Sequence, residues 1–332
     1  MVGWSGTARR GAGGRICWEG MQRLWCVVGL VAAAGLAGGA TKREVAITID
    51  DLPVAQSGPR GCEFGSLQMQ TLRLITAFLH LKVPVTAFLV AGECPELTPE
   101  QERTVLKLWQ DAGTELGNHT FSHADLNTMD PAKFEQDILQ GDEALRRLTG
   151  GRTPRYFRYP MLHLGTTAET KARIARFLTA HGYTNAPVTF DNSDWMFSEV
   201  YTDAITHGKM EASQHAKQDY LPYLESVVEF FEQRTTEVVG RDISQVLLLH
   251  ANRLNADMIG DVLAMLKKRG YRFISLDEAL KDAAYQQPEN YVGPGGFSWI
   301  HRWSMTKGMP NKGEPKEPTW LQKEYERIRK GE

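Results

Sequence analysis

Residues 45–53 read Val-Ala-Ile-Thr-Ile-Asp-Asp-Leu-Pro, an apolar and largely β-branched run that ends in two carboxylates and a proline. Such apolar side chains favour strands, whereas proline cannot continue the hydrogen bonds of a central strand. The stretch therefore predicts a buried strand over Val45–Ile49. Strict alternation would point Asp50 and Asp51 to opposite faces of the sheet, but a chain that turns at the strand end can bring both into one cleft.

Similar apolar runs recur along the chain, and segments with helical spacing of apolar residues lie between most of them. Further strands are predicted over Val85–Val90, Gly113–Gly117, Tyr156–Tyr159, Tyr183–Val188, Val246–His250 and Tyr271–Ile274. Helices are predicted over Leu67–Leu81, from Thr98, from Asp130 to Gly150, from Thr166 to near Gly182 and over Asn255–Arg269. From Ser198 to about Val239 the pattern is largely helical and polar. Strands that alternate with helices indicate a parallel sheet with helices outside it, and hence a βα barrel.

The composition limits the class of protein. With 332 residues, 42% of them hydrophobic, the chain can bury the core of one large domain or of two small ones. The formal net charge of -2 gives no indication of a nucleic-acid partner. We expect a leader over residues 1–40, a barrel over 41–284, and a tail over 285–332 that packs on the barrel or is partly disordered.

The N-terminal region has the order of a secretory signal peptide. A basic start near Met21 precedes an almost entirely apolar stretch from Leu24 to Gly39, and small residues follow up to Ala40. The apolar stretch is shorter than the about 20 residues that a membrane-spanning helix needs. We therefore expect translation to start at Met21, cleavage near Ala40, and a secreted or periplasmic protein with no stable membrane span. An uncleaved membrane anchor is the alternative.

The sequence has four cysteines, of which Cys17 and Cys26 belong to the leader. The remaining pair, Cys62 and Cys94, is a disulfide candidate in an oxidising compartment. Each of the two follows a predicted strand, so both can lie over the same end of the sheet. We expect a disulfide between them, with two free thiols as the alternative.

Polar residues gather where the predicted strands end. His119 and His123 follow the third predicted strand, and histidines four apart project to one side of a helical turn, so both can reach one cation. An aspartate would supply the third ligand of a catalytic metal site. Each polar residue also fits a structural role, but the carboxyl ends of barrel strands carry the active site. The other strand ends carry Arg158, Asp191 with Asp194, and His250.

Five motifs, in order along the chain, carry a resemblance to a known family. They are Thr48-Ile49-Asp50-Asp51, His119-Thr120-Phe121-Ser122-His123, Arg158-Tyr159-Pro160, Asp191-Asn192-Ser193-Asp194-Trp195 and Leu248-Leu249-His250. Over about residues 43–280 the chain resembles the polysaccharide deacetylases of the NodB-homology family, carbohydrate esterase family 4. The resemblance implies a distorted (β/α)7 barrel and the hydrolysis of acetyl groups, N-acetyl groups above all, from an acetylated glycan. Peptidoglycan, a chitin-like oligomer and an exopolysaccharide are all compatible substrates.

The resemblance further implies one divalent metal ion, zinc or cobalt, bound by Asp51, His119 and His123. Asp50 would be the general base, and Arg158 would hold it in place. These roles suit the chemistry, because an amide is a poor electrophile and a Lewis acid both polarises its carbonyl and acidifies water.

A general acid and a substrate pocket are implied in the same way. His250 would be the general acid, tuned by Asp191, and a histidine suits the protonation of a leaving amine near neutral pH. The backbone N–H of Met161 would help to bind the oxyanion. Trp195 and Leu248 would shape the pocket that takes the acetyl methyl group.

Two departures from the family pattern border the expected substrate groove. After Pro160 the family has an aromatic residue and a glycine, whereas this chain has Met161-Leu162-His163-Leu164 before Gly165. The segment between Trp195 and His250 is also long for the family. Both features bear on which sugar is bound. Two other functions stay open: a glycosidase, which needs two carboxyls and no metal, and a non-catalytic glycan- or metal-binding protein, which would not need a complete set of base, acid and ligands.

Overall fold

The computed structural model describes residues 1, 3, 43–55 and 61–331. The chain divides into residues 1–40 and residues 41–332, and every described helix and strand belongs to the second unit. The predicted signal peptide and the cysteines Cys17 and Cys26 lie outside the described residues. In the described part, no helix is both long enough and apolar enough to span a membrane.

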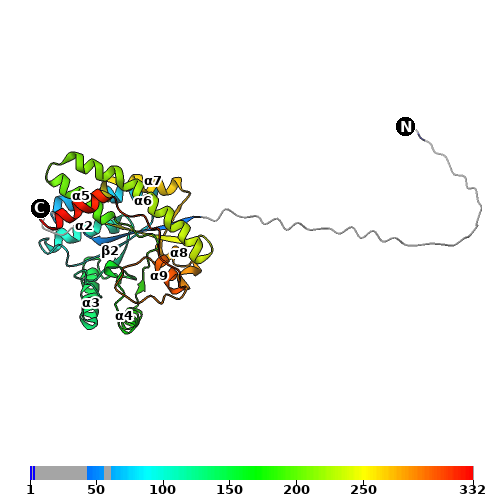
Figure 1. The fold of residues 1–332 in the computed structure, drawn as a ribbon, viewed down its shortest axis with the longest axis horizontal. Coiled ribbons are helices and arrows are strands. Elements are labelled where there is room, and N and C mark those ends of the chain that lie inside the picture. Colours follow the sequence, from blue (N-terminus) through cyan, green and yellow to red (C-terminus); the bar gives the residue numbers. More distant parts are fainter. Residues whose placement is uncertain (2, 4–42, 56–60, 332) are drawn as a thin grey trace, which may run out of the picture. The chain divides into compact units, whose positions relative to one another are not determined.

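A parallel sheet lies at the centre of the second unit, with helices around it (Figure 1). In the described residues it has seven strands, β1 (Glu44–Leu52), β2 (Val85–Leu89), β3 (Glu115–Asn118), β4 (Tyr156–Phe157), β5 (Thr184–Asn185), β6 (Ser244–His250) and β7 (Arg272–Ile274). The hydrogen-bonded order is β5-β4-β3-β2-β1-β6, and β7 pairs with β1. Each predicted strand is therefore present, with bounds that differ by a few residues.

The two outer strands of this order, β5 and β6, are bridged by the segment that follows β5. Phe190 pairs with Leu247 of β6 in parallel, and its N–H donates to the carbonyl of Val246 at 3.0 Å. Strand β7 joins only the first residues of β1, Glu44–Ala46. The sheet closes through an irregular segment instead of a regular ladder, which confirms the predicted distorted (β/α)7 barrel.

The helices follow the strands in the predicted alternation. They are α1 (Phe64–Leu81), α2 (Pro99–Asp111), α3 (Pro131–Leu148), α4 (Ala168–Ala180), α5 (Asp194–Thr206), α6 (Met210–Val239), α7 (Arg253–Lys268), α8 (Leu276–Ala279), α9 (Trp299–Thr306) and α10 (Thr319–Arg329), with short 3-10 turns η1 (Pro160–Leu162) and η2 (Ala283–Gln286). The segment from Ser198 to about Val239, predicted to be largely helical, consists of α5 and α6, and Gly208 has a φ of 68° between them.

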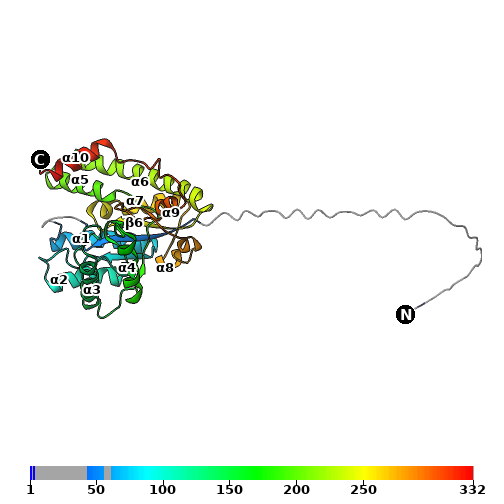
Figure 2. The ribbon, with the colours of Figure 1, turned by 60° about the horizontal axis from the view of Figure 1, so that its bottom comes forward.

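The segment after residue 285 contains two helices that pack on the rest of the unit. Trp303 of α9 is 1% exposed, and Leu321 of α10 is fully buried. The ring of Trp320 stacks on His215 of α6 at a centroid distance of 4.0 Å. In both views α10 lies beside α5 (Figure 2). This arrangement brings the end of the chain to the carboxyl end of the sheet.

Candidate active site

The two carboxylates at the end of β1 reach the same cavity because the strand is irregular there. The register between β1 and β2 shifts between Ile49 and Leu52. Asp51 has a φ of 60°, in the left-handed region that non-glycine residues seldom adopt. Normal alternation would separate Asp50 and Asp51, whereas both line one cavity in the structure. The sequence-based expectation that the chain turns here is confirmed.

The two histidines do not lie on a helical turn, so that part of the sequence argument is wrong. Residues 119–123 form a loop after β3, in which Thr120 and His123 have φ values of 68° and 53°. The loop nevertheless brings the rings of His119 and His123 together, with a centroid distance of 5.0 Å. The shared orientation comes from loop geometry, which the spacing of the histidines does not reveal.

Two side chains hold this loop in place. Asn118 accepts a hydrogen bond from the N–H of Thr120 and donates to the carbonyl of Ile138 in α3. Asp137 of α3 accepts hydrogen bonds from the backbone N–H and the hydroxyl of Ser122, at 3.1 and 2.9 Å. Buried polar groups with satisfied hydrogen bonds give a loop one conformation. Sequence analysis did not identify Asp137, because nothing in the sequence of α3 marks this residue as functional.

Asp51, His119 and His123 form a group whose ligand atoms all lie within 4.8 Å of one another. Asp51 Oδ1 is 3.2 Å from His119 Nε2 and 3.3 Å from His123 Nε2. His119 Nδ1 donates to the carbonyl of Arg158 at 2.8 Å, which leaves the lone pair on Nε2 when the ring is neutral. A lone pair then faces a carboxylate oxygen that lacks a hydrogen-bond partner in the described part of the chain. This donor set fits a cation.

The electrostatics of the group agree with that fit. Burial raises the pKa of Asp51, but His123 and His119 outweigh it and hold the pKa well below its ordinary value. Burial lowers the pKa of His123, which favours the neutral ring. A carboxylate and neutral imidazoles are the protonation states that bind a divalent metal.

Asp50 is almost fully buried and is held by a buried arginine. Arg158 Nη1 donates to Asp50 Oδ2 at 3.2 Å, and Nη2 donates to the hydroxyl of Thr48 at 3.1 Å. The guanidinium also lies 4.7 Å from the ring centroid of Phe88. The second carboxylate oxygen, Asp50 Oδ1, has no hydrogen-bond partner among the described residues. Arg158 thus fixes one oxygen and leaves the other available to a ligand.

The partner of His250 is Asp194, not Asp191 as the family resemblance implied. Asp194 Oδ1 accepts a hydrogen bond from His250 Nδ1 at 2.7 Å, and Oδ2 accepts one from the His250 backbone N–H at 2.8 Å. Asn252 and Asn255 also donate to Asp194 Oδ2. Burial lowers the pKa of His250, but Asp194 outweighs it and raises the pKa to about 10. The imidazole therefore holds a proton at neutral pH.

The motif Asp191-Asn192-Ser193-Asp194 offers two aspartates, and the start of α5 decides between them. Asp194 is the first residue of α5, is fully buried, and points back to the end of β6. Asp191 lies in the preceding turn and lines the cavity. Burial raises its pKa to about 6. The motif contains Asp194, but nothing in the sequence distinguishes it from Asp191 as the partner of His250.

The cavity above these residues has a volume of about 490 Å³. Met161, Trp195 and Leu248, to which the resemblance assigns substrate binding, line it. Residues of the C-terminal tail also line the cavity, which sequence analysis did not predict. The ring of Tyr325 of α10 meets that of Trp195 edge-on, with a centroid distance of 5.3 Å. The other tail residues that line the cavity are Gly296 and Arg329.

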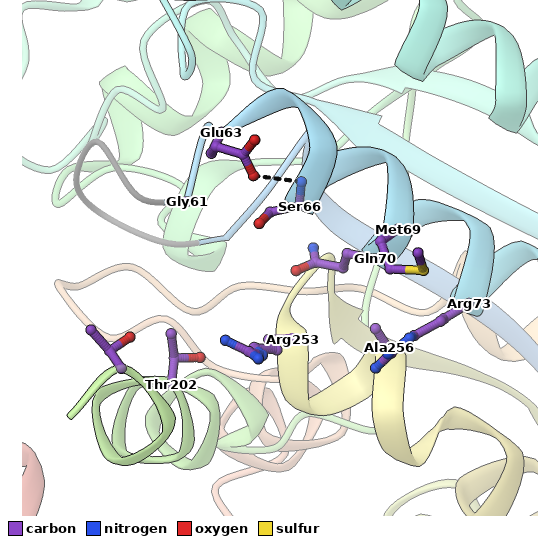
Figure 3. Close-up of a pocket in the computed structure, with 10 residues that line it drawn as sticks. Gly61, Glu63, Ser66, Met69, Gln70, Arg73, Thr202, Arg253 and Ala256 are labelled. Carbon is purple, nitrogen blue, oxygen red and sulfur yellow. Dashed lines mark hydrogen bonds between the residues drawn. The ribbon is translucent and has the colours of Figure 1, made fainter. Parts of the chain in front are cut away.

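A second cavity, of about 470 Å³, lies among α1, α5 and α7 (Figure 3). Two of the charged groups that line it, Glu63 and Arg73, have structural partners. The carboxylate of Glu63 accepts hydrogen bonds from backbone N–H groups at the start of α1, including that of Ser66 at 2.7 Å. Arg73 forms an ion pair with Asp257. The predicted catalytic and metal-binding residues other than the buried Arg158 line the first cavity, so the reaction is to be sought there.

The two cysteines of the barrel form a disulfide. Cys62 precedes α1 and Cys94 follows β2, and their Cα atoms are 5.4 Å apart. Cys62 packs with Val54, Leu67 and Val105 in a small apolar cluster. The bridge ties the loop after β1 to the loop after β2, close to the carboxyl ends of both strands.

Comparisons with known proteins show which proteins the chain is similar to. Residues 37–185 match the family model described as polysaccharide deacetylase. The chain is 27% identical over 250 residues to a peptidoglycan-N-acetylglucosamine deacetylase of Bacillus cereus, covering 74% of this chain and 70% of that protein. It is 22% identical over 269 residues to a chitin deacetylase of Colletotrichum lindemuthianum, covering 79% and 96%.

The solved structure of the chitin deacetylase from Colletotrichum lindemuthianum aligns with a TM-score of 0.49 and 24% identity, covering 74% of this chain and 89% of that one. The family match ends before Asp191, Asp194 and His250, so the structure alone brings these three residues to the matched part. By these comparisons, residues 37–185 are similar to the polysaccharide deacetylase family, and both relatives are deacetylases by name.

Proposed function

We propose that this chain is a metal-dependent hydrolase that removes acetyl groups, in the first place N-acetyl groups, from a glycan. The observation that carries the proposal is the meeting of Asp51 Oδ1 with His119 Nε2 and His123 Nε2, at 3.2 and 3.3 Å. One carboxylate oxygen and two imidazole nitrogens this close together suit a divalent ion. Imidazole and carboxylate ligands suit zinc or cobalt. A bound ion would polarise the acetyl carbonyl and acidify the attacking water.

Asp50 would act as the general base. Its Oδ1 is free of protein hydrogen bonds within the described residues, while its Oδ2 is held by Arg158. A carboxylate in this state can take a proton from water at a fixed position. Asp50 Oδ2 is only 3.7 Å from His119 Nε2, so the base lies beside the proposed ligands.

His250 would protonate the leaving nitrogen, which is required because an unprotonated amine is a poor leaving group. Asp194 orients the ring through Nδ1 and so points Nε2 away from the buried carboxylate. Asp50 and His250 are register partners on β1 and β6, which puts base and acid on adjacent strands at the same end of the sheet. The N–H of Met161 would help to stabilise the oxyanion, and Leu248 and Trp195 would enclose the acetyl methyl group.

The substrate class rests on the relatives, which act on peptidoglycan and on chitin according to their names. A secreted or periplasmic enzyme would meet such polymers, and the disulfide between Cys62 and Cys94 is compatible with an oxidising compartment.

The test is acetate release from a panel of acetylated glycans: peptidoglycan, chitin oligomers and an acetylated exopolysaccharide. We expect release from at least one of them, loss of release with a chelator, and recovery on addition of zinc or cobalt. Chelator-insensitive shortening of the glycan would identify a glycosidase instead. Binding without release of acetate from any member of the panel would identify a non-catalytic protein.

A further inference from the structure

The turn Pro160–His163 has a backbone conformation that its own residues do not favour. Met161 and Leu162 have φ values of 56° and 54°, where the Cβ atom of a non-glycine residue crowds the backbone. Neither residue is a glycine, the residue type that adopts such φ values without steric cost. The Met161 side chain is 49% exposed, so its own packing contributes little to holding the turn. Contacts from elsewhere in the fold must therefore stabilise this conformation.

Arg302 of α9 supplies one such contact from the tail. Its Nη2 donates to the carbonyl of Leu162 at 2.7 Å, and its Nε donates to the carbonyl of Phe297 at 2.9 Å. The side chain is 1% exposed. A buried guanidinium is unfavourable unless its donors are used, and here they tie the turn to the segment that precedes α9. Because Arg presents several donors in one rigid fork, lysine cannot replace these contacts.

Gly296 supplies a second contact, backbone against backbone. A Cβ atom added at Gly296 would lie 1.9 Å from the carbonyl oxygen of Met161, so no side chain fits there. Gly296 and Met161 both line the active-site cavity. The neighbouring Pro294 carbonyl accepts a hydrogen bond from Asn127 at 2.9 Å, which links the same segment to the loop that follows the two histidines. The tail segment is thus packed directly behind the turn.

We propose that Arg302 and Gly296 are positioning residues that fix the Met161 peptide against the reacting carbonyl. The inference rests on the proposed function, in which the Met161 N–H stabilises the oxyanion. Both residues lie outside residues 37–185, which match the family model. The tail thereby holds a turn in which two non-glycine residues have positive φ values, and the last part of the chain becomes necessary for full catalytic rate.

The decisive variant is Gly296→Ala in the whole protein, because a single methyl group must displace the Met161 carbonyl. Its matched control is Gly260→Ala, where the added methyl group meets no atom within 4 Å. With a substrate that the wild type accepts, we expect kcat to fall about 10- to 100-fold, with KM within about twofold of the control. Loss of transition-state stabilisation lowers kcat, whereas a purely structural defect lowers the folded fraction and the melting temperature.

Hydrogen exchange gives a second readout that does not need activity. We expect amides in residues 158–165 to exchange faster in Gly296→Ala than in Gly260→Ala, with the metal content of the two variants equal. If Gly296→Ala does not fold, Arg302→Lys is judged by the same two criteria against Arg241→Lys, a surface arginine paired with Asp282.

A folded Gly296→Ala with the kcat and the exchange of its control would overturn the inference. A wild type that releases no acetate would instead refute the proposed function. In that case the exchange comparison still decides whether the tail holds the turn.

Discussion

The two sides of the candidate site are built in different ways. The metal side consists of Asp50, Asp51, His119, His123 and Arg158, and all of it lies within the residues that match the family model. The acid side consists of Asp191, Asp194, Trp195, His250 and Tyr325, and all of it lies beyond them.

On the metal side, the three candidate metal ligands lie at the end of β1 or in the loop after β3, and local backbone geometry largely sets their direction. Asp50 differs, because the distant Arg158 holds it. Asp51 turns through its own left-handed backbone, and the histidine loop is held by Asn118 next to it. On the acid side, direction depends on distant contacts. Asp194 reaches a residue 56 positions later, and Tyr325 arrives from the last helix to meet Trp195. Short motifs therefore specify the metal side better than the acid side.

The largest effect is expected on the metal side, from Asp50→Asn. The variant keeps the size of the side chain but loses the proton acceptor, so kcat should fall about 10²- to 10⁴-fold. Because Asp51, His119 and His123 are unchanged, the metal content should stay that of the wild type. Steady-state kinetics and metal analysis on one preparation measure both; near wild-type acetate release would remove Asp50 from the role of base.

The acid side is tested by two isosteric changes in the same motif. Asp194→Asn removes the negative charge that orients His250 and raises its pKa, and we expect kcat to fall about 10²-fold or more. Asp191→Asn leaves the hydrogen bonds to His250 intact and should cost less than about tenfold. The ratio of the two rates tests the structural assignment. Equal losses, or a larger loss for Asp191→Asn, would show that Asp194 is not the residue that tunes the acid.

A smaller effect is expected from Tyr325→Ala, because the ring forms part of the cavity wall and does not reach the reacting atoms. Loss of an edge-on aromatic contact of about 0.5–1.5 kcal/mol corresponds to a rise in KM of roughly 2- to 13-fold, with kcat nearly unchanged. Tyr285→Phe is a suitable control, since Tyr285 is not among the residues that line the cavity. An unchanged KM would exclude α10 from substrate binding.

The smallest effect on activity is expected from removal of the disulfide in the double variant Cys62→Ala, Cys94→Ala. The bridge closes a segment with a sequence separation of 32 residues, and its loss should lower the free energy of unfolding by about 2–4 kcal/mol. Urea unfolding of the wild type and of the variant gives the difference. Because neither cysteine is among the residues that line the active-site cavity, kcat should change little. A large loss of activity in the folded variant would mean that the bridge also orders the metal side.

The sequence predicted where the candidate site residues lie, because a polar motif stands at the end of five predicted strands. It gave the wrong geometry for His119 and His123, since spacing alone favours a helix and cannot reveal two left-handed residues in a loop. It chose Asp191 over Asp194 because only the position of α5 against β6 distinguishes them. The contributions of Gly296, Arg302 and Tyr325 could not be predicted, as they depend on how a polar tail folds back over the barrel.

The central claim is that Asp51, His119 and His123 share one divalent ion. The most direct test is the metal content of protein that has been stripped with a chelator, reloaded with zinc or cobalt, and freed of excess ion. We predict about one ion per chain for the wild type and essentially none for His119→Ala. A His119→Ala variant that retains the full complement of metal, or a metal-free wild type that still releases acetate, would contradict the account.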